Sequence, residues 1–598
     1  MAEQVKKRSE VRAEDTWKLE DYFETDEAFK EACASLKEQI SGYKKYCGHL
    51  ADSADVLYEC LQFDDELCLL FERVYHYAFQ KQDQDTAEGK YQEFYGKAYD
   101  LYTEMAAESS YIAVEITAIG SEKLARMMEE KPQLKLYERS FEQILRKEPY
   151  MRSDVEERLL AKASAVTGAA DDIFKMFNNA DLKFAPAVDS QGKEHTVTHG
   201  TFVHLLESKD RVLRKSAFES MYSTYRSFQN TLAAMYQANL KEHSFYARIR
   251  GYESPWHYSL HNNAIPVEVF EQLIAAVRES FPAMYRYVGL RKKMLGVDDL
   301  SLYDVYVSVA QIPEKKYTFE EAKAIVYEAL KPMGQEYLDV LKEGFENRWI
   351  DVYENQGKRS GAYSAGAYGT HPYVLLNYNG TLDNMFTLAH EMGHAMHSYY
   401  SNSTQPYIYS QYKIFVAEVA STCNEILLME YLLKNTTDKK ERAYLLNHYL
   451  DSFKGTVYRQ TQFAEFEMRT NAMVEAGESL TAENLSSLYL ELNQKYYGSD
   501  MISDKEISYE WARIPHFYYN FYVYQYATGF SSAVAIAHSI LKEGAPAVER
   551  YKKFLSGGCS DSPVELLKIA GVNLETPAPI QEALDVFGSI IDEMETLV

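Results

Sequence analysis

The feature that most restricts how this chain can fold is the segment TLAHEMGHAMHSYY at residues 387–400. It places His390 and His394 four residues apart, with Glu391 directly after the first of them. On an α-helix this spacing puts both imidazoles on one face, where they can bind the same metal ion. Two imidazoles do not complete a zinc site. The segment therefore predicts a helix here and a further ligand supplied from elsewhere.

The flanking residues favour the same helix. Thr381 and Asp383 are typical of a helix start, and no proline follows them up to Ser403. Apolar side chains recur at helical spacing and predict a buried stripe, formed by Met385, Leu388, Met392, Met396 and Tyr399. The histidines lie on another face. A zinc ion held there would lower the pKa of a bound water, and Glu391 could take its proton as the water attacks a carbonyl.

The third ligand is not supplied by the continuation of the motif. In the astacin-like pattern a glycine and a further histidine follow, but those places hold His397 and Tyr400. His397 lies one turn beyond His394, and three consecutive turns would crowd one ion. We therefore interpret His397 as a supporting or packing residue.

A glutamate from a second helix is the alternative. The segment YKIFVAEVASTCNEILLMEYLL at 412–433 is helical in pattern and offers Glu418, Glu425 and Glu430. Glu418 stands among apolar and small residues, where an unpaired carboxylate is costly and a metal would compensate its charge. Glu425 lies seven residues further, on nearly the same face, and could orient a ligand imidazole. A solvated helix face remains the alternative interpretation for both glutamates.

Composition and charge exclude several classes of protein. Only 28 glycines and 15 prolines occur in 598 residues, which favours a mostly helical chain. The net charge of −26 repels phosphate backbones and anionic membranes, so we expect neither nucleic acid nor membrane as a partner. The six cysteines lack paired metal-ligand spacing, which indicates reduced thiols. With no apolar leader or membrane-length run in the sequence, a cytoplasmic location is expected.

Two changes of pattern divide the chain. Residues 14–180 have the pattern of successive amphipathic helices, and LKFAPAVDSQGKEHTVTHGTF at 182–202 predicts a paired hairpin around DSQG. We therefore expect an N-terminal helical lobe at 1–200 and a catalytic domain at 201–598. The glycine-rich, alternating stretch at 347–381 predicts a small sheet that leads directly into the histidine helix.

Several motifs together carry a resemblance to a known family. HEMGHAMHSYYS, FVAEVASTCNE, GAYSAGAYGTHPYVLLNYNGTLDN and PHFYYNFYVYQYATGF resemble the oligoendopeptidase F branch of the thimet oligopeptidase family, in the expected order and over roughly residues 110 to 590. The resemblance implies a mostly α, two-lobed, zincin-type metallopeptidase with a small sheet beside the active-site helix and a deep central channel. It also implies an endopeptidase for short, unstructured peptides. One Zn²⁺ per chain would be held by His390, His394 and Glu418, with Glu391 as general base.

The segment RIPHFYYNFYVYQYATGFSS at 513–532 predicts a tyrosine-rich helix opened by His516. Hydrolysis of an amide needs donors for the oxyanion that forms as water adds, and tyrosine and histidine can serve. The family places such residues opposite the metal, which maps onto His516, with Tyr522 and Tyr526 chosen over Tyr519. The resemblance also implies that an exposed strand edge binds extended peptide. The candidates there are Gly361, Ala362 and Tyr363 for the edge, and Tyr368, His371 and Tyr519 for substrate contact.

Two other functions fit the same features. A helical zinc carboxypeptidase can share the two-helix ligand pattern. An acidic helical peptide-binding scaffold could retain the motif without catalysis. The sequence does not decide between a monomer and a homodimer, nor does it identify the preferred peptide sequences.

Overall fold

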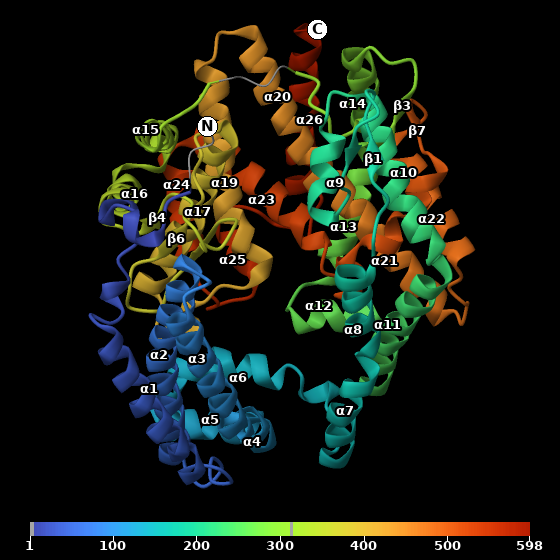
Figure 1. Ribbon diagram of the computed structural model, residues 1–598. Helices are drawn as coiled ribbons and strands as arrows, with labels where there is room; N and C mark the ends of the chain where they lie inside the picture. The colour runs from blue at the N-terminus through green and yellow to red at the C-terminus, as the bar shows by residue number, and fades with distance from the viewer. Residues whose placement is uncertain (1–4, 311–314, 598) are drawn as a thin grey trace. The chain divides into compact units, whose positions relative to one another are not determined.

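The computed structural model describes residues 5–310 and 315–597 and is built mainly from α-helices (Figure 1). Within those residues the strands are two or three residues long and form three small sheets. The predicted mostly helical fold is thereby confirmed. No helix in the described part of the chain combines the length and apolar character needed to cross a membrane.

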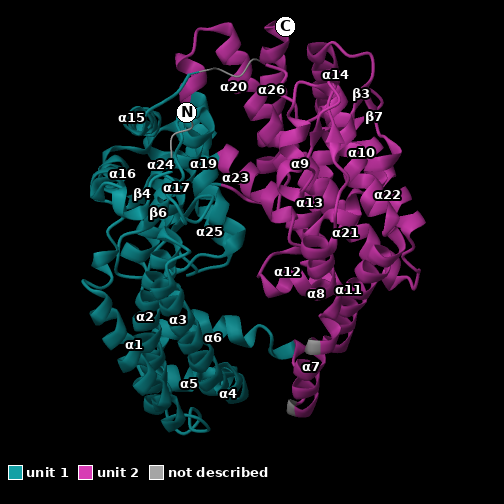
Figure 2. Ribbon diagram, viewed as in Figure 1, with its two compact units in different colours: residues 1–149, 315–430, 536–571 teal, residues 150–314, 431–535, 572–598 magenta. Residues whose placement is uncertain are grey.

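The chain divides into two compact units (Figure 2). Unit 1 contains residues 1–149, 315–430 and 536–571, and unit 2 contains residues 150–314, 431–535 and 572–598. This division differs from the single boundary near residue 200 that the sequence pattern predicts. Pattern changes along a chain report local composition, whereas compact units depend on which distant segments pack together.

Unit 1 carries the histidine helix. Its N-terminal helices are α1 (Asp26–Ile40), α2 (Ala54–Gln84), α3 (Gly89–Ser109), α4 (Tyr111–Ile119), α5 (Ser121–Glu130) and α6 (Glu138–Leu145). Its later helices include α15 (Phe319–Ala329), α16 (Gln335–Glu346), α17 (Leu382–Thr404), α18 (Tyr407–Ser410), α24 (Ala545–Leu555) and α25 (Pro563–Ile569), and most of α19 (Ile414–Asn435).

The N-terminal helices share a core with the small sheet, which is why residues 1–149 belong to the same unit as the histidine helix. The core cluster of α1 to α6 includes Tyr373 and Leu375 of the sheet. Tyr22 stacks on Tyr373 with ring centroids 4.6 Å apart. The buried carboxylate of Asp351 pairs with Arg8 at 2.5 Å and with Lys358 at 2.7 Å. The contacts of Tyr22 and Arg8 join segments more than 300 residues apart in the sequence.

The sheet of unit 1 confirms the predicted strand region. Its order is β4 (Ile350–Asp351), β6 (Tyr373–Leu375), β5 (Tyr363–Ala365), with β6 parallel to β4 and antiparallel to β5. Because β6 is central, β5 is an edge strand. The chain leaves β6 and enters α17 within seven residues, so the sheet fixes where the histidine helix begins.

Unit 2 is a helical assembly with two strand pairs. Its helices are α7 (Asp154–Thr167), α8 (Ala169–Met176), α9 (His199–Leu206), α10 (Arg211–Ser227), α11 (Gln229–Arg250), α12 (Pro255–Asn262), α13 (Val267–Glu279), α14 (Phe281–Leu295), α20 (Lys439–Phe453), α21 (Arg459–Glu475), α22 (Ala482–Tyr497), the first part of α23 (Tyr524–Glu543) and α26 (Ala578–Thr596). The predicted hairpin is present, since β1 (Ala187–Val188) pairs antiparallel with β2 (Glu194–His195). Strands β3 (Leu300–Ser301) and β7 (Met501–Ile502) pair in parallel.

Candidate metal centre

Helix α17 forms where the sequence predicts it. The Thr381 side chain caps the helix by accepting the backbone N–H of Asn384 at 3.1 Å. The stripe of Met385, Leu388, Met392 and Met396 is fully buried, whereas Tyr399 is partly exposed. Burial of this stripe orients the helix so that its histidine face is fixed relative to its neighbours.

Helix α19 packs unusually close to α17 at Gly393, the glycine of the motif. A Cβ atom at this position would lie 2.6 Å from the carbonyl oxygen of Ala420 and 2.6 Å from Cα of Ser421. One hydrogen bond joins the two helices, and a second, from α16, positions its donor. The Asn424 amide donates to the carbonyl of Ala389 at 3.1 Å, and Tyr337 donates to the Asn424 oxygen at 3.0 Å.

These positioning residues were not identified from the sequence. A glycine inside a strongly patterned helix is a signal of close packing, and it could have pointed to Gly393. Nothing local marks Asn424 or Tyr337, because their partners come from other helices.

The close approach brings together three side chains that could hold a metal ion. The ring centroids of His390 and His394 are 4.8 Å apart. Glu418 Oε2 lies 3.4 Å from Nε2 of His390 and 3.5 Å from Nε2 of His394. One donor atom from each of the three residues lies within 4.8 Å of the other two. Two imidazoles and one carboxylate are a donor set that suits zinc and leaves a coordination position open.

Glu425 occupies the place predicted for an orienting carboxylate. Its Oε1 lies 2.5 Å from Nδ1 of His390. Because the carboxylate accepts, Nδ1 carries the proton and Nε2 points to Glu418. Burial alone would lower the pKa of His390, but its hydrogen bonds to Glu418 and Glu425 outweigh burial and raise the pKa to about 10. The same histidines hold the pKa of Glu418 well below its usual range.

Burial does not distinguish Glu418 in the structure, contrary to the expectation from its apolar neighbours in the sequence. Its side chain is 44% exposed, although its neighbours on α19 are apolar. What distinguishes Glu418 is its position opposite His390 and His394, which the contact at Gly393 creates. The two nearby imidazoles favour the ionised form of Glu418, so its charge is stabilised although the side chain is partly exposed to water.

Glu391 lies beside this donor set but outside it. Its residue exposure is 6%, and its Oε2 has no hydrogen-bond partner among the described residues. Burial raises the pKa of Glu391, although His390 and His394 act in the opposite direction. A buried carboxylate with a raised pKa next to a metal-binding set suits a group that accepts and releases protons.

His397 does not join the donor set. Its ring stacks on Tyr412 with centroids 3.7 Å apart and lies 5.4 Å from the ring of Phe554. Burial lowers the pKa of His397 to about 3, so the imidazole is neutral. These contacts are those of a packing residue.

Three of the side chains predicted for substrate binding have partners inside unit 1. Tyr363 donates to Asp83 at 2.8 Å, and Tyr368 donates to the carbonyl of Gln405 at 2.9 Å. His371 stacks on Trp349 and lies 3.2 Å from a carboxylate oxygen of Asp21. A role in substrate binding for these three side chains stays a prediction. Gly361 and Ala362, in contrast, line an open cavity.

The tyrosine-rich motif gathers its own side chains in unit 2. The ring of His516 stacks on Tyr522 with centroids 5.9 Å apart, and Nε2 of His516 lies 3.3 Å from the Tyr526 hydroxyl. Tyr519 is 46% exposed, and its ring contacts both His516 and Tyr522.

The expectation of one continuous helix through this motif is wrong. His516 lies on a short 3₁₀ turn (Pro515–Tyr518), and α23 begins only at Tyr524. Between them Asn520 and Phe521 adopt positive φ angles of 42° and 57°, which interrupt any helix. The interruption is stabilised by the buried Glu467, which accepts the N–H of Phe521 at 3.1 Å. Ser259 donates to the carbonyl of Asn520 at 2.8 Å.

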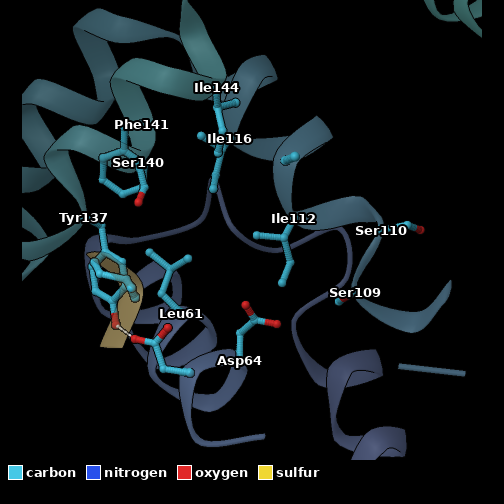
Figure 3. Close-up of a pocket in the computed structure, with 13 residues that line it drawn as sticks. Leu61, Asp64, Ser109, Ser110, Ile112, Ile116, Tyr137, Ser140, Phe141 and Ile144 are labelled. Atoms are coloured by element: carbon cyan, nitrogen blue, oxygen red, sulfur yellow. Dashed lines mark hydrogen bonds between the residues drawn. The ribbon is translucent and has the colours of Figure 1, made fainter. Parts of the chain in front are cut away.

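A separate cavity of about 300 Å³ lies among the N-terminal helices of unit 1 (Figure 3). Its walls are largely apolar, and Asp64 and Asp65 lie in its lining. Burial raises the pKa of Asp65 to about 6, although the hydroxyl of Tyr137 donates to it at 2.6 Å. These two carboxylates do not belong to the group of described residues that could hold a metal ion together.

Comparisons with known proteins identify the family of this chain. The family model described as Peptidase family M3 matches residues 204–586, and the one described as Oligopeptidase F matches residues 115–184. Oligopeptidase PepF of Bacillus subtilis is 49% identical over 597 residues, which cover 100% of this chain and 89% of that protein.

Two solved structures are also similar to this chain. One, from Chlamydophila abortus, has a TM-score of 0.94 at 36% identity and covers 100% of both chains. The other, oligoendopeptidase-F from Enterococcus faecium, has a TM-score of 0.75 at 38% identity and covers 96% of this chain and 99% of that one. The chain therefore belongs to peptidase family M3, in its oligopeptidase F branch, and is a metalloendopeptidase.

Proposed function

We propose that this chain is a zinc-dependent oligopeptidase that cleaves internal bonds of short, unstructured peptides. The observation that carries the proposal is the convergence of His390, His394 and Glu418 beside the buried Glu391. Two imidazoles and a carboxylate suit one zinc ion per chain. Glu425 accepts a hydrogen bond from Nδ1 of His390 and so keeps the proton on that nitrogen.

Each protein group has a defined part in the proposed reaction. When bound, zinc supplies Lewis acidity that polarises the substrate carbonyl and makes water acidic. Glu391 takes the proton from the attacking water and passes it to the leaving amine. Its buried Oε2 has no partner among the described residues and is available for that transfer, and burial raises the pKa of Glu391 above the ordinary value of a glutamate, which favours uptake of the proton.

The oxyanion is proposed to receive hydrogen bonds from His516 and from tyrosine. Tyr526 and Tyr522 are favoured because both contact the imidazole of His516. Burial lowers the pKa of His516, so its ring is neutral at physiological pH and donates through one nitrogen. Tyr519 remains an additional candidate for substrate contact.

The substrates are proposed to be short peptides, with folded proteins excluded by the channel that the resemblance implies. We propose neither nucleic acid nor membrane as a partner, in keeping with a net charge of −26. The six cysteines are free thiols, which supports a reducing, cytoplasmic setting.

The central experiment replaces Glu391 by glutamine and compares zinc content with peptide hydrolysis. We expect about one zinc per chain in both proteins and a fall in kcat of about 10² to 10⁴ for the variant. Glu104→Gln, an exposed change of the same type on α3, serves as the control. Undiminished hydrolysis by Glu391→Gln would refute the proposed general base.

The endopeptidase assignment is tested with a peptide blocked at both termini. An endopeptidase cleaves it internally, whereas a carboxypeptidase needs the free carboxylate. Mass spectrometry of the products, with and without a chelator, separates the two activities and shows whether hydrolysis depends on metal.

A further inference from the structure

The helix break at residues 519–523 brings the candidate oxyanion donors His516, Tyr522 and Tyr526 together. His516 and Tyr526 are ten residues apart in the sequence, which on a continuous α-helix would separate them by about 15 Å along the axis. In the structure Nε2 of His516 lies 3.3 Å from the Tyr526 hydroxyl. The ring of Tyr522 stacks on His516 with centroids 5.9 Å apart. These contacts therefore exist only because the helix is broken.

The backbone of this break is strained. Two consecutive residues other than glycine have left-handed φ angles, 42° at Asn520 and 57° at Phe521. Asparagine tolerates this region, whereas a bulky phenylalanine does so at a cost. Such a conformation persists only where its surroundings hold it, and functional sites are where it is most often found. Phe521 is buried, and its ring packs edge-on against Phe270 with centroids 5.6 Å apart.

Two polar side chains hold a single peptide group of the break. Glu467 on α21 accepts the N–H of Phe521 at 3.1 Å, and Ser259 on α12 donates to the carbonyl of Asn520 at 2.8 Å. This N–H and this carbonyl belong to the same peptide group, and in a trans peptide they point in opposite directions. The two helices therefore grip one peptide plane from both sides and fix the dihedral angles next to it.

Glu467 differs from another buried acid on the same helix. Glu465 is fully buried and forms an ion pair with Arg278 at 2.5 Å. Glu467 is 2% exposed, and its Oε2 has no partner among the described residues. Burial raises the pKa of Glu467 to about 8, although the N–H of Phe521 acts in the opposite direction. An apolar side chain would be accommodated there more easily than an acid without a counter-ion, so the acceptor has a purpose other than packing.

We propose that Glu467, by holding the peptide group between Asn520 and Phe521, is a positioning residue for the candidate oxyanion donors. The inference rests on the proposed function, in which those donors stabilise the oxyanion. Glu467 acts through the break and not by contact with the substrate. A displacement of about 1 Å far from the reacting atoms can lower the rate by about 10²-fold, so a small shift of the break is enough to impair the donors.

The test compares two replacements of Glu467 of similar size. Glu467→Gln keeps an oxygen that accepts the N–H of Phe521, whereas Glu467→Leu has none. We expect Glu467→Gln to hydrolyse peptides as the wild type does, and Glu467→Leu to lose about 10- to 100-fold in kcat. KM and zinc content should stay unchanged, as expected for an interaction that matters in the transition state alone. Hydrogen exchange at the Phe521 amide should quicken in Glu467→Leu and stay slow in Glu467→Gln.

Matched controls separate positioning from a general loss of stability. Glu465→Leu removes an equally buried carboxylate from α21, and we expect a lower urea midpoint with kcat unchanged. Ser259→Ala removes the second anchor of the peptide group and should lower kcat about threefold to tenfold. Its control is Ser280→Ala, because Ser280 is equally buried but bonds to the carbonyl of Val277 at 3.0 Å and to the hydroxyl of Tyr458 at 2.9 Å.

The outcomes separate this inference from the proposed function. Wild-type kcat in folded Glu467→Leu, or equal kcat in Ser259→Ala and Ser280→Ala, would overturn the positioning role. A Glu467→Gln variant as impaired as Glu467→Leu would contradict it too, since the acceptor would then be present without effect. If Glu467→Leu fails to fold, the serine pair decides. Absence of cleavage by the zinc-loaded wild type would instead refute the peptidase proposal, and hydrogen exchange would still decide whether Glu467 holds the break.

Discussion

Gly393 offers a sharp test of how the two helices hold the candidate metal centre. Replacing it by alanine places a methyl group 2.6 Å from the Ala420 carbonyl oxygen, whereas ordinary contact begins near 3.4 Å. Because the clash is with the backbone of α19, α17 and α19 must part by about 0.8 Å. The proposed metal ligands lie on both helices, and ligand distances tolerate only about 0.2 Å. We therefore expect zinc affinity to fall at least about 10- to 100-fold.

The effect on stability should be much smaller than the effect on zinc. Overpacking costs about 1–3 kcal/mol, while alanine in a helix gains about 1 kcal/mol over glycine. Competition with a chromophoric chelator measures the zinc affinity, and thermal unfolding of the metal-free protein measures stability. Gly96→Ala on α3 is the matched control, since no atom lies within 4 Å of the place its new methyl group would take. This control should stabilise the protein without changing zinc binding, and wild-type zinc affinity in Gly393→Ala would refute the reasoning.

Three further changes test other parts of the site and fold. Glu425→Ala should lower zinc affinity about 10- to 100-fold in chelator competition, because His390 loses the acceptor for its Nδ1 proton; unchanged affinity would remove Glu425 from the site. Tyr526→Phe should reduce kcat about 10²- to 10³-fold with normal zinc content if its hydroxyl serves the oxyanion; an unchanged kcat would transfer the role to another residue. Burial alone would raise the pKa of Glu510, but Arg459 and Arg513 outweigh it and lower the pKa to about 2. The ionised Glu510 therefore stabilises the folded state fully above pH 4.5, the ordinary pKa of a glutamate, and this stabilisation is lost as the pH falls toward 2. The difference in urea midpoint between wild type and Glu510→Gln should shrink over that range, and a constant difference would contradict this sign.

Much of the local structure could be predicted from the sequence. The spacing of His390 and His394, the capping threonine and the apolar stripe are short-range signals, and α17 forms accordingly. The hairpin at 182–202 and the strands at 347–381 follow from alternation and turn residues, and both are present. Periodicity works here because each element must present one apolar face to a core.

Other features depended on partners that periodicity does not reveal. The break at Asn520 and Phe521 is stabilised by Glu467 and Ser259, which are more than 50 residues away in the chain. Residues 1–149 share a core with the sheet because of contacts such as those of Arg8 with Asp351 and of Tyr22 with Tyr373. No sequence pattern in residues 1–149 or in the sheet strands predicts that these two parts of the chain pack together.

The sequence by itself determined the helix, the two imidazoles on one face, the adjacent Glu391 and the supply of glutamates on a second helix. Only the tertiary structure decided that Glu418 faces both imidazoles while Glu425 lies against Nδ1 of His390. The physical reason is that helical spacing fixes directions about one axis. The distance and rotation between two axes are set by the packing at Gly393 and Asn424.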